Sequence, residues 1–406
     1  MKKVLIIGAG AQGNVIANVL SRTEGVGEII LADLNPDRAE EIAQYCKSGR
    51  IKAAQLDASK PQEIASLMKK GDFALVANAT LPAFNKNIIE AACGAGIDYV
   101  DMASNEFFPR EGVLLDQLEC EEEWNRTGLR ALINGGGDAG LVNVMAKEAA
   151  EELDSIDYIG IKDYGVVECD RPVALWSMRT FLEDCYDSPV IWREGKHEFV
   201  DPFSGEEEYY FPPPLDVKGK VFNHIHEEPM TIPLYIGKPV GLCDFKIGDP
   251  AIEMWKYLLV DLDLLSPQKQ SFGGCSVSPR EVLFSKIPPT PSVKSMIDLV
   301  EEKRIKSQLV LAVDVIGSKQ GSRLHYKLWT DSPNVEQACA RIPGASDVSW
   351  ITSVPASIFA LMILRGQVKR KGMMPPEVFD SEERRLFFNG IREWDIKINK
   401  QVSYLL

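Results

Sequence analysis

The sequence predicts an α/β protein that begins with a doubly wound parallel sheet and continues into a mixed α+β domain. Over residues 1–140, short apolar segments alternate with amphipathic helical patterns, as expected for a parallel sheet with crossover helices. From Leu141 the pattern changes to strand-like segments separated by proline-rich and acidic loops. Helical apolar spacing returns near the end, and we expect this helix to pack on the first domain. The expected regions are therefore 1–140, 141–345 and 346–406.

The first strand and the turn after it form a dinucleotide-binding motif. Val4–Ile7 is an uninterrupted apolar run, which is typical of a strand buried on both faces. A G-x-G-x-x-G turn and then helical spacing follow, and this is the context that the motif requires. In such a Rossmann unit the glycines make a tight turn, let backbone N–H groups approach a pyrophosphate, and let helix and strand pack closely. The residues expected at the cofactor are Gly8, Gly10, Ala11, Gln12 and Gly13.

The acid at the end of the second strand-like segment refines the choice of cofactor. Glu28–Asp33 has the pattern of a strand, and Asp33 lies at the spacing expected for a carboxylate that binds ribose hydroxyls. A carboxylate there repels a 2′-phosphate, so the sequence favours NAD over NADP. Alternatively, Asp33 only caps the next helix, since Asn35-Pro36-Asp37 is typical of a helix start.

Other strand ends predict the rest of the binding edge, because ligands bind beyond the carboxyl ends of the strands in open α/β sheets. The residues expected along the cofactor there are Asp57, Asn78, Ala79 and Thr80. Asp57 could equally cap the helix that starts at Pro61, and Asn78–Thr80 could be a plain turn.

Composition restricts the possible partners and compartments. The formal net charge of -14 argues against nucleic acid or an anionic membrane as a partner. No run has the length of a membrane span, and the N-terminal apolar run is too short for a targeting segment. The 8 cysteines are scattered without a C-x-x-C pair, which suits reduced thiols rather than disulfides or a zinc site. We therefore expect a cytoplasmic protein.

Four segments resemble the saccharopine dehydrogenase-like family of NAD(P)-dependent oxidoreductases. They are the glycine turn with Asp33, YVDMAS at 99–104, INGGGDAGLVNVMA at 133–146 and GMMPPEVF at 372–379. The third is the most specific, although the family usually has proline where this chain has Ala139. The resemblance implies a Rossmann domain with an inserted α/β substrate domain, homodimers or larger homo-oligomers, and hydride transfer at a carbon that bears an amine. Within the family, the chain most resembles the lysine 6-dehydrogenases.

Amine oxidation defines which residue types to seek near the nicotinamide. The amine must be held deprotonated, and a base must activate water against the imine. Asp101 and Asp138 follow strands at the expected position, although each could simply cap a loop. Lys162, next to a strand-like segment of the second domain, is the third catalytic candidate.

The second domain also provides candidates for substrate binding, which are Tyr164, Arg171 and His226. The guanidinium of Arg171 suits a substrate carboxylate. His224 and His226 could together bind a metal, but without a clear third ligand we expect no metal site.

These expectations combine into an NAD-dependent oxidative deamination of an amino acid or a diamine, with L-lysine as the candidate substrate. The first alternative is a saccharopine- or carboxynorspermidine-type dehydrogenase that forms or cleaves a secondary amine. The second is a protein that binds NAD without turnover, against which the polar residues at the sheet edge argue. The tail from Gly372 is expected to wrap over the surface.

Overall fold

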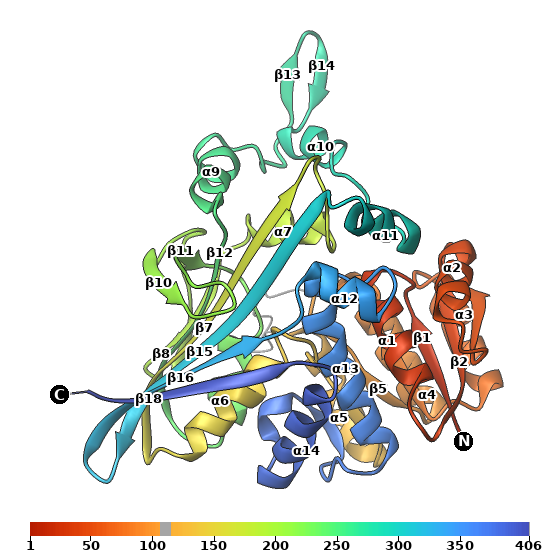
Figure 1. The fold of residues 1–406 in the computed structure, drawn as a ribbon, viewed down its shortest axis with the longest axis horizontal. Helices are drawn as coiled ribbons and strands as arrows, with labels where there is room; N and C mark the ends of the chain where they lie inside the picture. The colour runs from red at the N-terminus through yellow and green to blue at the C-terminus, as the bar shows by residue number, and fades with distance from the viewer. Residues whose placement is uncertain (106–114, 406) are drawn as a thin grey trace.

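Two β-sheets form the cores of two domains that pack against each other (Figure 1). The computed structural model describes residues 1–105 and 115–405. The expected fold class is confirmed, because a parallel Rossmann sheet comes first and a mixed sheet follows. Helix α13 (Asp347–Leu364) then returns to contact helix α1 (Ala11–Ser21) of the first domain, as expected.

The first domain is a doubly wound sheet in which all neighbouring strands run parallel. In order across the sheet, the strands are β17 (Gly372–Met374), β6 (Arg130–Leu132), β5 (Asp98–Val100), β4 (Leu75–Asn78), β1 (Lys2–Ile7), β2 (Val26–Asp33) and β3 (Ile51–Gln55). The remaining helices of this domain are α2 (Pro36–Cys46), α3 (Pro61–Gly71), α4 (Asn85–Ala95) and α5 (Glu121–Thr127), with the short η1 (Pro82–Phe84) and η2 (Asp116–Cys120). Because the strand order reverses between β1 and β4, ligands of this sheet bind outside the carboxyl ends of these strands.

The tail segment from Gly372 is a buried strand, so the expected surface wrap is wrong for this part of the chain. β17 adds to the sheet beside β6 in parallel register, and Met373 and Met374 are each only 1% exposed. The reason is that β6 would otherwise leave an unpaired edge next to the apolar core, and the Gly-Met-Met sequence can cover it. The short η4 (Pro376–Val378) therefore begins at the carboxyl edge of the Rossmann sheet.

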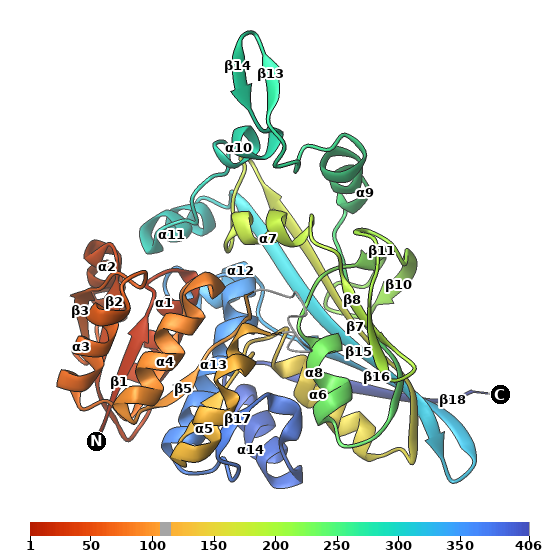
Figure 2. The same ribbon diagram turned by 180° about the vertical axis from the view of Figure 1, so that it is seen from behind.

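The second domain is built on a mixed sheet of nine strands. They are β7 (Ser155–Cys169), β8 (Val190–Arg193), β9 (Lys196–Phe199), β10 (Glu207–Phe211), β11 (Val217–Asn223), β12 (Val240–Gly248), β15 (Ile305–Lys319), β16 (Ser322–Asp331) and β18 (Lys397–Leu405). Only β12 and β7 run parallel, and the last strand of the chain, β18, pairs with β16 in this sheet. A separate hairpin of β13 (Gln270–Phe272) and β14 (Cys275–Val277) projects away from both domains (Figure 2).

Helices connect and cover these strands. They are α6 (Leu141–Glu151), α7 (Met178–Asp184), α8 (Glu228–Tyr235), α9 (Ile252–Lys256) with the π-helical η3 (Tyr257–Asp261), α10 (Pro279–Phe284), α11 (Val293–Glu301), α12 (Val335–Arg341) and α14 (Ser381–Arg392).

The two faces of the second sheet have different surroundings. On β7, Ile159 and Ile161 pack into the large core that also contains α6, α13 and the Rossmann strands. The side chain of Tyr164 points to the opposite face of β7 and packs with Phe211 and Val310 in a separate cluster on the outer face. Since successive side chains of a strand point to opposite faces, the alternation along β7 decides which residues face the Rossmann domain.

Helix α13 is a core helix between the two sheets. It has the length and hydropathy of a membrane span, but 89% of that window is buried inside the protein. Its contacts with α1 on one side and β15 on the other explain why it is apolar around its whole circumference.

We predict that Phe359→Ala in α13 lowers the free energy of unfolding by about 3–5 kcal/mol, because it leaves a cavity in a close-packed core. Phe359 is fully buried and stacks on Phe387 with ring centroids 4.3 Å apart. Urea unfolding measures the change. The exposed Val402→Ala is the control, with an expected change within about 0.5 kcal/mol. Equal effects of the two substitutions would contradict the assignment of α13 as the core helix.

Candidate active site

The glycine turn between β1 and α1 has the shape that a dinucleotide requires. Gly8 has a positive φ of 104°, and a Cβ there would lie 2.4 Å from the Ala79 carbonyl oxygen. A Cβ at Gly13 would lie 1.9 Å from the Gly8 oxygen, so helix and strand are packed at a distance that only glycine allows. At Gly10, by contrast, no atom lies within 4 Å of the place of a Cβ. This open side precedes the first turn of α1, so the residues present fit the pyrophosphate of NAD(P).

Asp33 connects the glycine turn to the segment that precedes α2. Its Oδ2 accepts a hydrogen bond from the Ala9 N–H at 2.7 Å, and its Oδ1 accepts one from the Asn35 N–H at 2.9 Å. The cap of α2 is Asn35 itself, which accepts from the Asp37 N–H at 3.1 Å. Ribose binding therefore remains our prediction for Asp33.

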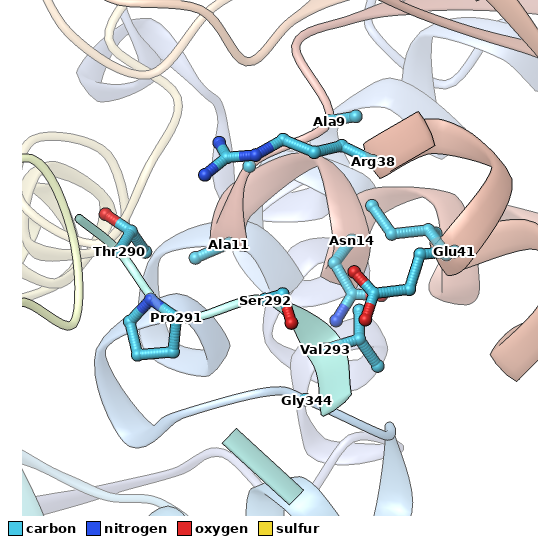
Figure 3. Close-up of a pocket in the computed structure, with 12 residues that line it drawn as sticks. Ala9, Ala11, Asn14, Arg38, Glu41, Thr290, Pro291, Ser292, Val293 and Gly344 are labelled. Carbon is cyan, nitrogen blue, oxygen red and sulfur yellow. The ribbon is translucent and has the colours of Figure 1, made fainter. Parts of the chain in front are cut away.

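A pocket over the glycine turn is shared by the two domains (Figure 3). The turn, Arg38 and Glu41 line one side, and residues 290–293 of the second domain line the other. The start of α11 is fixed to α2, because the Lys294 N–H donates to Glu41 at 3.0 Å. In Figure 3 the guanidinium of Arg38 extends over the pocket, where it suits a 2′-phosphate. Since Asp33 favours NAD and Arg38 favours NADP, the pocket is compatible with both cofactors.

The other residues expected at the cofactor form turns at strand ends. The Oδ1 of Asp57 accepts from the Ser59 N–H at 3.0 Å and from the Ser59 hydroxyl at 2.6 Å. The N-cap of α3 is Lys60 and no side chain caps this helix, so the alternative that Asp57 caps it is wrong. Asn78 is buried, and its Oδ1 accepts from the N–H and the hydroxyl of Thr80 at 3.0 and 2.7 Å. Ala79 lies between them and contacts Gly8, so Asn78–Thr80 stands beside the glycine turn. Contact of these four residues with the cofactor stays a prediction.

Asp101 is buried beneath the edge of the sheet and holds neighbouring strand ends together. Its Oδ1 accepts from the Asn134 N–H at 2.7 Å, and its Oδ2 accepts from the Tyr99 hydroxyl at 3.0 Å and from Gln117 at 3.2 Å. Burial raises the pKa of Asp101 to about 7, against the opposing effect of these hydrogen bonds. With its donors supplied by the protein, Asp101 has the geometry of a residue that positions the site.

Five carboxyl groups and one histidine gather where the second domain meets the carboxyl edge of the Rossmann sheet. We call them the acid cluster, which consists of Asp138, Asp163, Asp184, His226, Glu227 and Glu228. Asp138 stands on the turn after β6, Asp163 on β7 and Asp184 at the end of α7, while the other three residues precede or begin α8. The three aspartates and His226 are half-buried, and Glu227 and Glu228 are buried.

Hydrogen bonds fix the geometry of the acid cluster. The Nδ1 of His226 lies 2.6 Å from Glu228 Oε2 and 3.2 Å from Glu227 Oε2, and the ring stacks on Phe245 at 4.0 Å. Glu227 Oε1 accepts from the Ser104 N–H at 2.6 Å, which ties the cluster to the loop after β5. The carboxyls of Asp138 and Asp163 are hydrogen-bonded to each other. Such a bond requires that one of the two holds a proton.

The buried setting changes the protonation of these groups. Burial raises the pKa of Asp138, and burial together with the charge of Asp138 raises the pKa of Asp163 well above its usual value. Burial likewise raises the pKa of Asp184. Burial alone would lower the pKa of His226, but the charges of Glu228 and Glu227 outweigh it and hold the imidazole protonated. The cluster therefore combines a protonated histidine with a carboxyl pair that shares a proton.

The other candidates from the sequence lie away from the acid cluster. Lys162 points to the outer face of the second sheet, where its Nζ contacts the Tyr158 hydroxyl at 2.9 Å and Asp314 at 3.2 Å. The side chain of Tyr164 lies on the same outer face as Lys162 and packs on Phe211, with ring centroids 4.7 Å apart. Arg171 is exposed in the loop after β7. Of the six catalytic and substrate candidates, the structure brings only Asp138 and His226 together in the cluster.

Sequence reasoning missed four members of the cluster, namely Asp163, Asp184, Glu227 and Glu228. Glu227 and Glu228 are neighbours of His226 in the sequence, and Asp163 is the neighbour of Lys162. No signal in the sequence shows which side chains of β7 face the Rossmann domain. The His224 ring packs beside Phe181 and Phe245, at centroid distances of 6.0 and 6.4 Å. Burial, together with the charge of His226, lowers the pKa of His224 to about 3, so the two histidines differ in charge.

The acid cluster also contains the described residues best placed to hold a metal ion. Ligand atoms of His226, Glu227 and Glu228 all lie within 4.8 Å of one another. These atoms already form ion pairs and a backbone hydrogen bond, so we retain the prediction that the site holds no metal.

Comparisons with known proteins give matches along nearly the whole chain. The families described as "Saccharopine dehydrogenase NADP binding domain" and "Saccharopine dehydrogenase C-terminal domain" match residues 4–134 and 136–392. Carboxyaminopropylagmatine dehydrogenase of Synechocystis sp. is 22% identical over 387 residues, which are 94% of each chain. Carboxynorspermidine synthase of Vibrio cholerae is 25% identical over 393 residues, 92% of this chain and 91% of that relative. The solved apo saccharopine dehydrogenase (L-Glu forming) of Saccharomyces cerevisiae has a TM-score of 0.70 at 15% identity, covers 99% of this chain and 100% of its own, and thus shares the fold.

We predict that Asp33→Ala weakens NAD binding about tenfold and reduces the discrimination against NADP, because a charged ribose acceptor and a repulsive charge are both lost. Titration of each cofactor by fluorescence measures the two affinities. Glu40→Ala is the control, since Glu40 is exposed on α2 and does not line the pocket, so both affinities should stay unchanged. Unchanged NAD affinity in the Asp33 variant would show that the ribose lies elsewhere.

Proposed function

We propose that this chain, which belongs to the saccharopine dehydrogenase family and is an NAD(P)-dependent dehydrogenase, forms or cleaves a secondary amine. In the forming direction it joins a cationic amine to an aldehyde. The observation that carries this proposal is the acid cluster at the carboxyl edge of the Rossmann sheet. Membership of a dehydrogenase family also removes the alternative of a protein that binds NAD without turnover.

Two relatives support the secondary amine rather than the deamination of lysine. Their names, carboxynorspermidine synthase and carboxyaminopropylagmatine dehydrogenase, denote polyamine derivatives that carry a carboxyl group. Each aligns with more than nine-tenths of this chain, so the likeness includes the second domain that holds Asp163, Asp184 and His226. We therefore prefer the alternative in which a C–N bond is formed or cleaved between two larger groups.

The charge of the acid cluster favours a cationic substrate. His226 is the one basic side chain in the cluster, and it is paired with Glu228 and Glu227. Asp138, Asp163 and Asp184 keep raised pKa values, chiefly because burial disfavours their charged forms. An ammonium group at these half-buried aspartates supplies the missing positive charge and stabilises their ionised forms.

The acid cluster can move the protons that the condensation requires. The Asp138–Asp163 pair takes a proton from the substrate ammonium, and the free amine then forms the C–N bond with the aldehyde carbon. His226 gives a proton to the hydroxyl of the resulting carbinolamine, and the C–O bond breaks with release of water. The proton held by the carboxyl pair then replaces the one that His226 gave. When bound, the reduced nicotinamide supplies the hydride that reduces the C=N bond.

Oxidative deamination of a primary amine such as L-lysine is the second candidate, because the chain resembles the lysine 6-dehydrogenases in its length, in the acid Asp33 after the second strand and in the segment 372–377. The same residues serve it in reverse, with water attacking the imine. The two candidates differ in whether the nitrogen leaves as ammonia or remains bonded to a second carbon chain. Homo-oligomeric assembly also remains a prediction from the resemblance.

We predict that the protein oxidises NADPH or NADH when a short diamine and an amino-acid semialdehyde are both present. Omission of either substrate should abolish the absorbance change at the cofactor band. Lysine with NAD or NADP should give at most a small fraction of that rate. A high rate with lysine alone would favour the second candidate, and no turnover in either assay would contradict the proposal.

We predict that Asp163→Asn lowers kcat/KM about 100-fold, because the carboxyl pair loses the group that accepts the proton. Glu168→Gln is the matched control, since Glu168 is exposed on the same strand and should change the rate less than twofold. Steady-state kinetics of both variants across pH measure the effect. A pH profile of Asp163→Asn that coincides with that of the unmodified protein would exclude the pair as the base.

A further inference from the structure

A buried glutamate from the tail of the chain lies next to the acid cluster but is not part of it. Glu377 lies in η4, just past the end of β17, and is fully buried. It therefore stands at the same carboxyl edge of the Rossmann sheet as the loops that carry Asp101 and Asp138. Its position depends on the unexpected strand β17, which brings a distant part of the chain to this edge.

One oxygen of Glu377 is connected by hydrogen bonds to the turn that carries Asp138. Glu377 Oε2 accepts from Asn143 Nδ2 at 3.1 Å. Asn143 Oδ1 in turn accepts from the Gly140 N–H at 2.8 Å, and Gly140 is bridged to Gly136 across that turn. Asn143 is fully buried, so these contacts fix the orientation of its amide. One side chain, that of Asn143, therefore connects Glu377 to the turn that carries Asp138.

The other oxygen of Glu377 has no hydrogen-bond partner within residues 1–105 and 115–405, and the same is true of Glu228 Oε1. Both side chains are fully buried. Glu228 and Thr231 lie three residues apart on α8, hence on one face of that helix, and Asn143 Nδ2 lies between Thr231 Oγ1 at 3.5 Å and Glu377 Oε2. Figure 2 shows α6 and α8 side by side here. Two unpartnered carboxyl oxygens are thus held in one buried region.

We propose that Glu377 is a positioning residue of the active site, which orients the Asp138 turn through Asn143 and carries a proton so that Glu228 is the anion that pairs with His226. The proposal extends the proposed function, on which its catalytic part rests. A neutral Glu377 satisfies the chain of hydrogen bonds without placing a second charge beside Glu228. An ionised Glu377 would add a like charge in a buried region, which is strongly unfavourable.

The titratable groups around Glu377 agree with this assignment. Those that face it in the described residues are Glu228 and Tyr235 of α8 and Cys243 of β12. Burial raises the pKa of Glu377 to about 7, hydrogen bonds from Thr231 and Asn143 oppose the rise, and the charge of Glu228 adds to it. Because this pKa lies above the usual 4.5, ionisation destabilises the folded state as the pH rises from about 4.5 to 7 and adds no further change above it.

The test compares Glu377→Gln, Glu377→Ala and Asp347→Asn in the full chain. Glutamine imitates the protonated carboxyl, whereas alanine removes the partner of Asn143. Asp347 is the matched control, since it is a fully buried carboxyl with an unpartnered oxygen and a pKa raised by burial to about 6, but it contacts Ser307 away from the acid cluster. The unfolding midpoint is measured from pH 5 to 8, and kcat and KM are measured over the same range with the diamine and the semialdehyde.

We expect Glu377→Gln to unfold at a higher temperature than the unmodified protein at pH 8 but not at pH 5, whether or not the assayed substrates turn over. We also expect kcat of the unmodified protein to decline as the pH rises through about 7, where Glu377 ionises, and kcat of Glu377→Gln to show no such decline. Glu377→Ala should lose about tenfold in kcat at every pH. Asp347→Asn should alter the pH dependence of stability but keep the unmodified kcat profile. A melting difference that does not depend on pH would overturn the proton on Glu377. An unaltered kcat profile of Glu377→Gln would overturn its role in the site, whereas absence of all turnover with the melting difference present would count against the proposed function alone.

Discussion

The ion pair between His226 and Glu228 is the contact on which the arrangement of the site depends. It places one positive charge among carboxyl groups that would otherwise be too costly to bury together. Glu228 is fully buried, so its charge has no solvent to replace the imidazolium. The pair also sets the position of Glu227, which reaches across to the Ser104 N–H of the Rossmann domain. The same ion pair therefore offsets the buried negative charge and positions the contact between the two domains.

The two domains meet at both ends of the expected cofactor path. At the nucleotide end, the start of α11 bonds to Glu41, and Asn14 Nδ2 donates to the Pro343 carbonyl oxygen at 2.9 Å. At the other end, Glu227 bonds to Ser104. The first contacts lie over the glycine turn, and the last lies beside the acid cluster. Any change in the angle between the domains would alter both ends together, which couples cofactor binding to the geometry of the substrate side.

The sequence was sufficient for the Rossmann domain because its signals are local. A buried strand, a glycine turn, a helix and Asp33 follow one another directly, and each constrains the next. For the second domain, the sequence predicted only the structural class, a mixed α+β domain. The strand that carries Lys162 and Asp163 was recognised, but which of the two faces the cofactor depends on the surroundings of the whole sheet. Glu377 belongs to a segment that resembles the family, yet its place beside the site follows from the pairing of β17 with β6, a contact between residues more than 200 positions apart.

In the proposed reaction, the acid cluster binds an ammonium group and exchanges a proton with it. Calorimetric titration of the cofactor-bound protein with 1,3-diaminopropane, in buffers that differ in ionisation enthalpy, measures the protons exchanged on binding. We predict release of about one proton per site near pH 7, because the bound cation ionises the Asp138–Asp163 pair, and much weaker binding of 1,3-propanediol. Binding of the diamine without proton release, or equal affinity for the uncharged diol, would contradict this prediction.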